Sequence, residues 1–432
     1  MQYYSLKNKS IKSSFKQAVL GGIAEDKGLY FPNKIEKLND KFYNDLINLS
    51  ELEISFEVMK QFVGKEINSN KLIEILEDTI SFDFPLIKLS KNIYTLELFH
   101  GPTMAFKDVG ARFMSRCINY FINNTNKKVS VLVATSGDTG GAVASGFNNI
   151  SGTEVIILYP KGRVSDIQEK QLTTNGKNVR AFEVDGSFDD CQKMVKDAFV
   201  DKDLKKTHNL TSANSINVAR WLPQSLYYFF TMKKFAELNI LNKVVFSIPS
   251  GNFGNICAGI VASKLGLNIK HFVASTNSND TVTRFLRNGK YQPNKTIRTL
   301  SNAMDVSDPS NFIRIKKLYK NDLKKIKNNF TSYSFNDNET VLALKEIYND
   351  YKYIADPHGA IGFLGLKKYL KTNRNNFGVF FETAHPIKFR KTVESNLDIN
   401  LKYPYQIKRI LNKKNRKESI KSYEELKEAI MF

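Results

Sequence analysis

The sequence has 432 residues, of which 42% are hydrophobic and 25% charged, with a formal net charge of +21. A chain of this length and composition is typical of a globular protein with more than one domain. Its three cysteines and five histidines lack the spacing of a disulfide framework or a zinc site. We find no apolar signal segment and no apolar run long enough to cross a bilayer, so we expect a cytoplasmic protein without a membrane partner.

The excess of positive charge has two possible interpretations, nucleic-acid binding or a generally basic surface. Clustered lysine and arginine would indicate a nucleic-acid-binding protein. Here the basic residues are spread along the chain, only the stretch 408–421 is dense, and no known nucleic-acid-binding motif accompanies them. We therefore expect solvated basic surfaces that could also attract an anionic substrate, and we keep nucleic-acid binding as an alternative.

Residues 1–85 are expected to form a helical N-terminal unit. A glycine-punctuated loop at 21–32 precedes two amphipathic helices, which begin behind Ser50 and behind Ser69. No catalytic group of residues stands out in this unit, so we expect it to serve packing or subunit contact.

From residue 86 onward, strands alternate with helices, which predicts parallel sheets covered by helices on both faces. The expected strands are 129–134, 155–159, 179–184, 244–248, 270–274 and 379–381, and the later helices lie near 255–266, 281–288, 338–350 and 360–371. A helical stretch at 215–237 separates two such sets. We therefore expect a smaller α/β lobe at 86–240 and a larger one at 241–432 that ends in a helical tail. Ligands of such sheets bind at the carboxyl ends of the strands.

Lys107 lies where an apolar segment, residues 93–99, gives way to a helical pattern. A lysine between Phe106 and a glycine-bearing turn can lose its hydration, which lowers the pKa of the amine. Such an amine can form a Schiff base with a carbonyl cofactor. On its own the pattern is weak, because most lysines are solvated surface groups.

Three further loops follow expected strands. Residues 135–141 open a helix and could seat an anion on backbone N–H groups, and Asp138 favours an amino-acid guest over a bare phosphate. Residues 250–255 lack the lysine of a Walker loop and suit a phosphate that is held permanently. In the third loop, 382–389, Thr383 could hydrogen-bond a ring nitrogen, and His385 is interpreted first as a turn histidine.

Together these segments resemble the threonine synthase family, enzymes of fold type II that depend on pyridoxal 5′-phosphate. The resemblance extends from about residue 3 to about 405. It rests on Phe99-His100-Gly101-Pro102-Thr103-Met104-Ala105-Phe106-Lys107-Asp108, on Gly28-Leu29-Tyr30-Phe31-Pro32, on both glycine loops and on 382–389. The lysine segment and the N-terminal loop are specific to this family, whereas other fold-type II enzymes share the glycine loops. The resemblance implies two doubly wound α/β lobes, like the β chain of tryptophan synthase, beside the N-terminal unit.

The resemblance also implies a role for each matching residue. Lys107, beside Phe106, would hold the cofactor covalently and then move protons, while Thr383 would face the ring nitrogen. The residues implied for the cofactor phosphate are Ser250, Gly251, Asn252, Phe253, Gly254 and Asn255. Those implied for the substrate carboxylate are Thr135, Ser136, Gly137, Asp138 and Thr139, and the candidates for the substrate phosphate are Lys161, Arg163, Asn217 and Arg220. No metal is expected.

The implied activity is that of a lyase in threonine biosynthesis. It converts O-phospho-L-homoserine and water to L-threonine and phosphate by γ-elimination and β-addition. A related phospholyase that releases 2-oxobutyrate, or a threonine or serine dehydratase, would share the lysine and the glycine loops. The expected partner is a small-molecule substrate rather than nucleic acid, and the chain is expected to be a monomer or homodimer.

Overall fold

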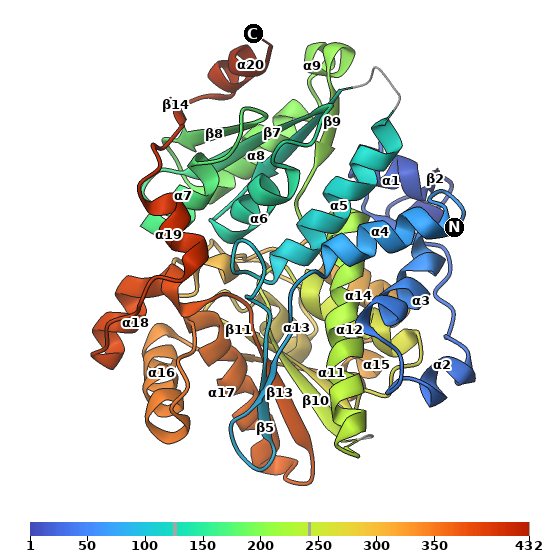
Figure 1. Ribbon diagram of the computed structural model, residues 1–432, viewed down its shortest axis with the longest axis vertical. Coiled ribbons are helices and arrows are strands. Elements are labelled where there is room, and N and C mark those ends of the chain that lie inside the picture. Colours follow the sequence, from blue (N-terminus) through green and yellow to red (C-terminus); the bar gives the residue numbers. More distant parts are fainter. Residues whose placement is uncertain (124–127, 241–242, 432) are drawn as a thin grey trace.

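The computed structural model describes residues 1–123, 128–240 and 243–431. The expected domain boundary after residue 240 lies at the edge of these ranges, and residue 432 lies outside them. Two mainly parallel sheets form the body of the molecule, one of six strands in the order β12-β11-β10-β13-β5-β4 and one of five in the order β14-β8-β7-β6-β9. Figure 1 shows the five-stranded sheet at the top and the larger sheet at the bottom, with the N-terminal unit against one side.

The N-terminal unit combines helices with a small sheet. The two expected amphipathic helices are present, and Ser50 caps the first of them through the backbone N–H of Glu53. An antiparallel sheet was not expected, because strands of three or four residues are too short to show an alternating pattern. The elements are β1 (Gln2–Ser5), β2 (Lys12–Ser14), α1 (Phe15–Gly21), β3 (Tyr30–Pro32), α2 (Asp40–Asn44), α3 (Glu51–Val63) and α4 (Ser69–Thr79).

The six-stranded sheet is parallel except for the antiparallel pair β4 and β5. Its strands are β4 (Leu86–Lys88), β5 (Ile93–Glu97), β10 (Val244–Pro249), β11 (His271–Thr276), β12 (Phe330–Ser334) and β13 (Phe377–Glu382). The elements between and after them are α12 (Gly254–Lys264), α13 (Thr281–Asn288), η2 (Asn302–Met304), α14 (Phe312–Leu318), α15 (Leu323–Asn329), α16 (Asp337–Tyr351), α17 (Pro357–Thr372), η3 (Pro386–Phe389) and α18 (Arg390–Leu397). The apolar runs predicted as strands are buried along β10, β11 and β13.

The five-stranded sheet is parallel throughout. Its strands are β6 (Val129–Ala134), β7 (Thr153–Pro160), β8 (Val179–Val184), β9 (Asn209–Ser212) and β14 (Glu418–Ile420). The remaining elements are α5 (Lys107–Ile122), α6 (Asp138–Phe147), α7 (Asp166–Thr173), α8 (Phe188–Ala198), α9 (Lys202–Thr207), α10 (Val218–Trp221), η1 (Leu222–Ser225), α11 (Leu226–Glu237), α19 (Tyr405–Leu411) and α20 (Tyr423–Met431). Strands β6 to β9 of this sheet precede residues 215–237, and β10 to β13 of the larger sheet follow them.

Two segments lie in a different sheet from the one that the expected boundaries gave them. Residues 86–97 were expected in the smaller lobe, but β5 pairs in parallel with β13 and so belongs to the larger sheet. The C-terminal tail was expected in the larger lobe, but β14 pairs with β8 at the edge of the five-stranded sheet. In Figure 1 the red C-terminal segment runs from α18 beside the larger sheet up to α20 beside the smaller one. The chain therefore crosses between the lobes at both ends of the α/β region.

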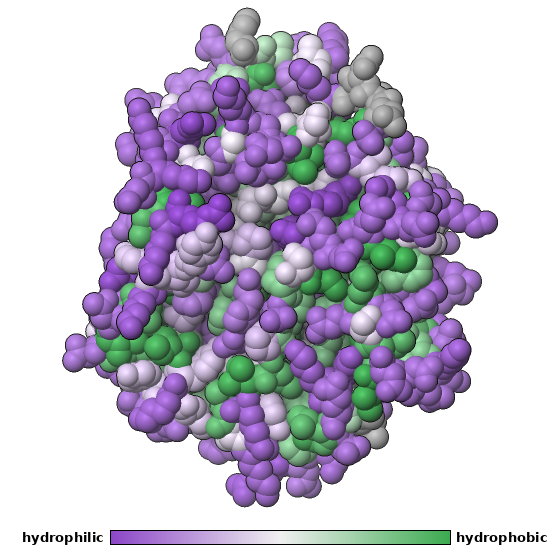
Figure 2. Space-filling view, viewed as in Figure 1, coloured by the Kyte–Doolittle hydropathy of each residue, from purple (hydrophilic) through white to green (hydrophobic). Residues whose placement is uncertain are grey.

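Lys107 stands at the first of these crossings. After β5 the chain leaves the larger sheet, and Lys107 is the first residue of α5, which packs against α6 of the smaller lobe. Hydrophilic residues cover most of the face shown in Figure 2, interrupted by scattered apolar patches. Within the described ranges, none of the helices combines the length and apolar character needed to cross a membrane.

We expect the contact between α5 and α10 to be sensitive to a single methyl group. A Cβ atom added at Gly110 would lie 2.3 Å from the carbonyl oxygen of Arg220. Gly110→Ala should therefore lower the free energy of unfolding by about 1–3 kcal/mol, because the helices would have to separate. Urea denaturation measures this.

The matched control is Gly21→Ala, since a Cβ there meets nothing within 4 Å. This variant should change stability by less than about 1 kcal/mol. Equal stability of the two variants would contradict the close approach of α5 to α10.

Candidate active site

The loop before Lys107 is closed by its own side chains. The carboxylate of Asp108 accepts hydrogen bonds from the backbone N–H of Thr103 at 2.9 Å and from the Thr103 hydroxyl at 2.5 Å. A Cβ at Gly101 would lie 2.5 Å from Asp108 Oδ2, so this position has no room for a larger residue. The Gly-Pro-Thr motif therefore fixes where α5, and with it Lys107, begins.

The end of β13 holds this loop from the other side. The backbone N–H of Phe106 donates to the carbonyl of Thr383 at 2.9 Å, and that of His385 donates to the carbonyl of Met104 at 3.1 Å. Ala105 and Ala384 form an isolated antiparallel bridge between these bonds. The two segments that the sequence singled out, separated by more than 270 residues, are thus in direct contact, and Thr383 lies beside the Lys107 segment.

Lys107 is partly exposed as a residue, but its amine lies in the interior and makes no hydrogen bond or ion pair with any residue in the described part of the chain. Burial lowers its pKa from the ordinary 10.5 to about 8, against the opposing effect of the Asp138 carboxylate. The neighbouring cations Lys388 and Arg220 lower the pKa further. About a tenth of this amine is therefore uncharged at pH 7, far more than for an ordinary lysine, in agreement with the direction that the sequence-based hypothesis expected.

Lys107 opens into a cavity between the lobes. The smaller lobe supplies the loop after β6, and the larger lobe supplies the loop after β10 and the end of β13. The residues that line this cavity include Phe106, Lys107, Thr135, Ser136, Asp138, Thr139, Asn214, Ser215, Arg220, Gly251, Asn252, Phe253, Gly254, Asn255, Met304, His358 and Thr383. The carboxyl ends of parallel strands meet here, as the sequence analysis expected.

The loop 135–140 presents backbone N–H groups to the cavity. The Thr135 hydroxyl accepts from the N–H groups of Gly137 and Gly140 at 2.9 and 2.8 Å and so shapes the turn. Gly137 has φ of 130°, and a Cβ there would lie 2.4 Å from the Gln168 side chain. The N–H groups of Ser136, Asp138 and Thr139 have no acceptor among the residues described, and α6 begins at Asp138. This arrangement suits an anion.

The loop 250–255 differs from the expectation in the groups that it offers. The side chains of Ser250 and Asn255 donate to the nearby carbonyls of Ile248 and Pro249, and the Asn252 amide donates to the Ser215 hydroxyl at 3.1 Å. These side chains are therefore engaged in shaping the loop. The backbone N–H groups of 251–255 are the free donors, since none of them has an acceptor in the described ranges. Phe253 has φ of 60°, which turns consecutive N–H groups to one side at the start of α12.

Five of the predicted site residues do not line the cavity. Gly137 and Ser250 shape the two loops from behind. Lys161 and Arg163 lie exposed in the turn after β7. Asn217 is buried, caps α10, and donates from its amide to the Val19 carbonyl at 2.9 Å, so its side chain is occupied in joining the N-terminal unit to the body.

Arg220 is the predicted phosphate contact that lines the cavity. It is 3% exposed, its Nη1 donates to the Lys107 carbonyl at 3.3 Å, and its Nε has no partner in the part of the chain described. Burial lowers the pKa of this guanidinium to about 10, so it stays cationic at neutral pH. A buried cation with an unused N–H at a cavity is suited to bind an anionic group.

Sequence reasoning missed His358 and Lys388. His358 lines the cavity; its Nδ1 contacts the Asp356 carboxylate, and its Nε2 accepts from the N–H of Ala303 at 3.3 Å. Lys388 is completely buried and pairs with Asp138. The Asp-Pro pattern of a helix start, followed by a histidine, could have drawn attention to His358. No local pattern marks Lys388, because its partner lies 250 residues away.

The family of pyridoxal-phosphate dependent enzymes matches residues 83–378. A model of the threonine synthase N terminus matches residues 2–80, and one of the threonine synthase C-terminal part matches 359–430. The first match covers most strands of both sheets and every residue that lines the cavity except Thr383, and it places the chain among pyridoxal-phosphate dependent enzymes.

Similar proteins identify the particular family. The chain is 44% identical over 411 residues to threonine synthase of Buchnera aphidicola from Acyrthosiphon pisum, and 40% identical over 407 residues to that of Escherichia coli, with 94% of each chain covered. The crystal structure of Escherichia coli threonine synthase matches with a TM-score of 0.94 at 38% identity over 100% of this chain and 99% of the other. A pyridoxal-phosphate-bound threonine synthase from Brucella melitensis matches with a TM-score of 0.92 at 31% identity over 100% and 98%.

The chain belongs to the threonine synthase family. The predictions of this family, of fold type II, of pyridoxal phosphate as cofactor and of a lyase are thereby confirmed. A tomato threonine deaminase shares only the fold, at 16% identity and a TM-score of 0.53, with 76% of this chain and 89% of that chain covered.

The residues of the cavity fit the cofactor. Lys107 offers an amine of lowered pKa to the aldehyde. The five N–H groups of 251–255, which have no acceptor in the described ranges, can bind the phosphate. A Cβ at Gly251 would lie 2.7 Å from Met304 Cα, so the backbone at Met304 packs closely against this loop. The Thr383 hydroxyl lines the same cavity as a neutral partner for a ring nitrogen.

We predict that the lowered pKa of Lys107 is visible when the cofactor-free chain takes up pyridoxal phosphate. Only the uncharged amine attacks an aldehyde, so the rate should rise about tenfold per pH unit and level off above pH 8. Stopped-flow absorbance from pH 6 to 10 measures this. Lys107→Met is the control and should show no covalent uptake. A rate still rising beyond pH 10 would mean that the amine is solvated.

Proposed function

We propose that this cavity converts O-phospho-L-homoserine and water into L-threonine and phosphate, as the last step of threonine biosynthesis. The observation that carries the proposal is the arrangement around one buried amine. Lys107 is flanked by two separate sets of backbone N–H groups without an acceptor in the described ranges, those of Ser136, Asp138 and Thr139 and those of 251–255, and by the cation Arg220. These two sets of N–H groups and Arg220 could together bind two anionic groups of a substrate and one of a cofactor.

When bound, the cofactor supplies an electron sink that acidifies the C–H bonds near the substrate's amino nitrogen. In our proposal Lys107 takes the proton from Cα, and its lowered pKa lets one amine both accept and return protons near neutral pH. Thr383 would offer a neutral hydroxyl to the ring nitrogen, which would leave that nitrogen without a proton. The N–H groups of Ser136, Asp138 and Thr139 hold the substrate carboxylate, with Thr135 and Gly137 shaping that loop.

We assign the substrate phosphate to Arg220 first among the predicted candidates. Its buried position supports this choice, because a charge-assisted hydrogen bond is strong where water is excluded. Lys161 and Arg163 remain candidates for attracting the substrate toward the cavity, and Asn217 for supporting α10, which carries Arg220. In our proposal the cavity has to exclude water once the substrate is bound, because early protonation would divert the reaction to an oxoacid.

We further propose that the protein is cytoplasmic and works as a monomer or homodimer on a small molecule, without a nucleic-acid partner. Its three cysteines are free and buried, which suits a reducing compartment. Size-exclusion chromatography with light scattering decides between monomer and dimer, and a gel shift at low salt would reveal nucleic-acid binding.

The reaction is tested by following the products of O-phospho-L-homoserine together with the visible absorbance of the bound cofactor. We expect threonine and phosphate in equal amounts from the wild type. Lys107→Ala should lose at least about 10²–10⁴-fold in kcat, because the residue that moves protons is gone. Release of 2-oxobutyrate instead of threonine would move the function to the phospholyases. A chain that binds no pyridoxal phosphate would overturn the proposal.

Arg220→Gln should raise KM for O-phospho-L-homoserine by roughly tenfold to a hundredfold, the effect of losing a charged hydrogen bond. Arg163→Gln, which alters an exposed cation of the same kind, should leave KM within about twofold. Steady-state kinetics measure both, and an unchanged cofactor absorbance shows that each variant is folded. The reverse pattern would assign the phosphate to the turn after β7.

A further inference from the structure

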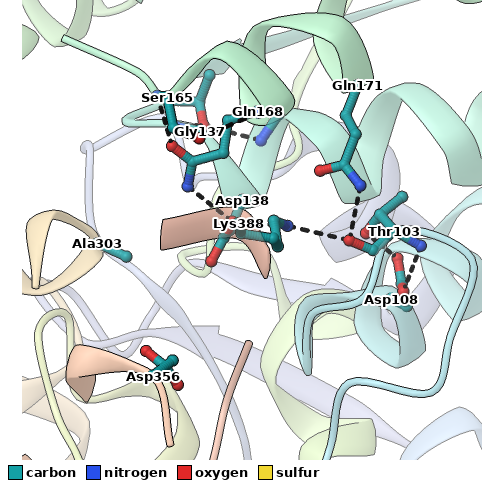
Figure 3. Close-up of polar contacts among 12 residues, drawn as sticks. Thr103, Asp108, Gly137, Asp138, Ser165, Gln168, Gln171, Ala303, Asp356 and Lys388 are labelled. Atoms are coloured by element: carbon teal, nitrogen blue, oxygen red, sulfur yellow. Dashed lines mark hydrogen bonds and ion pairs between the residues drawn. The ribbon is translucent and has the colours of Figure 1, made fainter. Parts of the chain in front are cut away.

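Lys388 is a buried cation for which the proposed reaction has no direct use. It belongs to η3, which begins shortly after Thr383 and the end of β13, and its side chain is completely buried. Its Nζ lies 2.7 Å from Asp138 Oδ1 and donates to the carbonyl oxygen of Thr103 at 3.0 Å. Figure 3 shows Lys388 between these partners, which come from the smaller lobe and from the lysine loop.

Two glutamines of α7 complete this network. Gln168 Nε2 donates to Asp138 Oδ1 at 2.9 Å, and Gln171 Nε2 donates to the carbonyl of Thr103 at 2.9 Å. Asp138 thus has two donors on one oxygen, and both donors hold it on the side of α7 and η3. Three segments that line or support the cavity meet at the Lys388 amine.

Asp138 also lines the cavity beside Lys107, so the carboxylate has two amines in its neighbourhood. It pairs with Lys388, whereas no ion pair joins it to Lys107 within the described ranges. The charged neighbours that act on Lys107 are Asp138, Lys388 and Arg220. Among these, Asp138 favours the charged amine and the two cations favour the neutral one.

A buried carboxylate requires a cation, because desolvation without a partner is costly. If Lys388 were absent, Lys107 would be the remaining amine near Asp138. An ion pair between the two would keep Lys107 protonated, and a protonated amine cannot attack an aldehyde or accept a proton from carbon. The uncompensated charge would also stand in the loop that offers its N–H groups to an anion.

We propose that Lys388 is a positioning residue, which binds the Asp138 carboxylate so that Asp138 does not form an ion pair with Lys107. Because Lys388 also donates to the carbonyl of Thr103, it links the loop 135–140 to the loop before Lys107. This inference rests on the proposed role of Lys107 as the cofactor lysine, but it does not depend on which amino acid is converted.

The test is the pH dependence of covalent pyridoxal phosphate uptake by the full cofactor-free chain, which requires no substrate. The variants are Lys388→Met, Asp138→Asn and the double variant Lys388→Met/Asp138→Asn. In Lys388→Met the midpoint should rise by at least about one pH unit, which makes uptake at pH 7 about tenfold slower. In the double variant the unpaired carboxylate is gone as well, so the midpoint should return to within about half a pH unit of the wild type.

Several outcomes would overturn the proposal. One is a wild-type midpoint in Lys388→Met, and another is a double variant shifted as far as Lys388→Met alone, because either would mean that Lys388 acts only through packing. If Lys388→Met does not fold, as judged by circular dichroism, Asp138→Asn decides the question. Loss of this carboxylate should lower the midpoint below that of the wild type, and an unchanged or raised midpoint would contradict the proposal.

The same measurement separates this inference from the proposed function. A chain that shows the expected midpoint shifts but makes no threonine would retain the role of Lys388 and lose the proposed reaction. A chain that makes threonine with no shift in Lys388→Met would do the opposite.

Discussion

A lysine amine that must be uncharged part of the time has to be kept away from both water and carboxylates, and the arrangement around Lys107 follows from that constraint. Burial removes the water. The bridge between Ala105 and Ala384 and the bonds beside it keep the amine's segment fixed against the larger sheet. The carboxylate that favours the charged form of this amine, Asp138, is held by a second lysine. A site of this kind needs both lobes, because neither contains the amine's full surroundings.

Much of this site could be predicted from the sequence, because its parts are local. Buried parallel strands appear as short apolar runs, and the loops that follow them lie at one edge of the sheet by the rules of α/β topology. For this reason Lys107, the loops 135–141 and 250–255, and Thr383 were expected to lie close together, and Lys107, Thr383 and several residues of each loop line one cavity. Local backbone conformation also explains a glycine in these loops, since Gly137 has a positive φ.

The remainder depends on contacts between distant segments, which single residues do not reveal. β5 pairs with β13 and β14 with β8 across more than 230 residues, and a strand of three residues such as β14 carries no pattern. The ion pair of Lys388 and Asp138 is of the same kind. In the loop 250–255 the residue types suggested side-chain donors, but the fold engages those side chains internally and leaves the backbone N–H groups free.

The long-range strand pairs also bear on how the chain is made. During synthesis from the N-terminus, β8 emerges early, yet its edge stays uncovered until β14, at residues 418–420, leaves the ribosome. In the larger sheet, β5 likewise lacks its parallel neighbour until β13, at residues 377–382, has been made. An open strand edge can pair with a neighbouring chain. Each lobe therefore reaches its final width only after its distant strand has been made, and the open strand edge of the nascent chain needs protection until then.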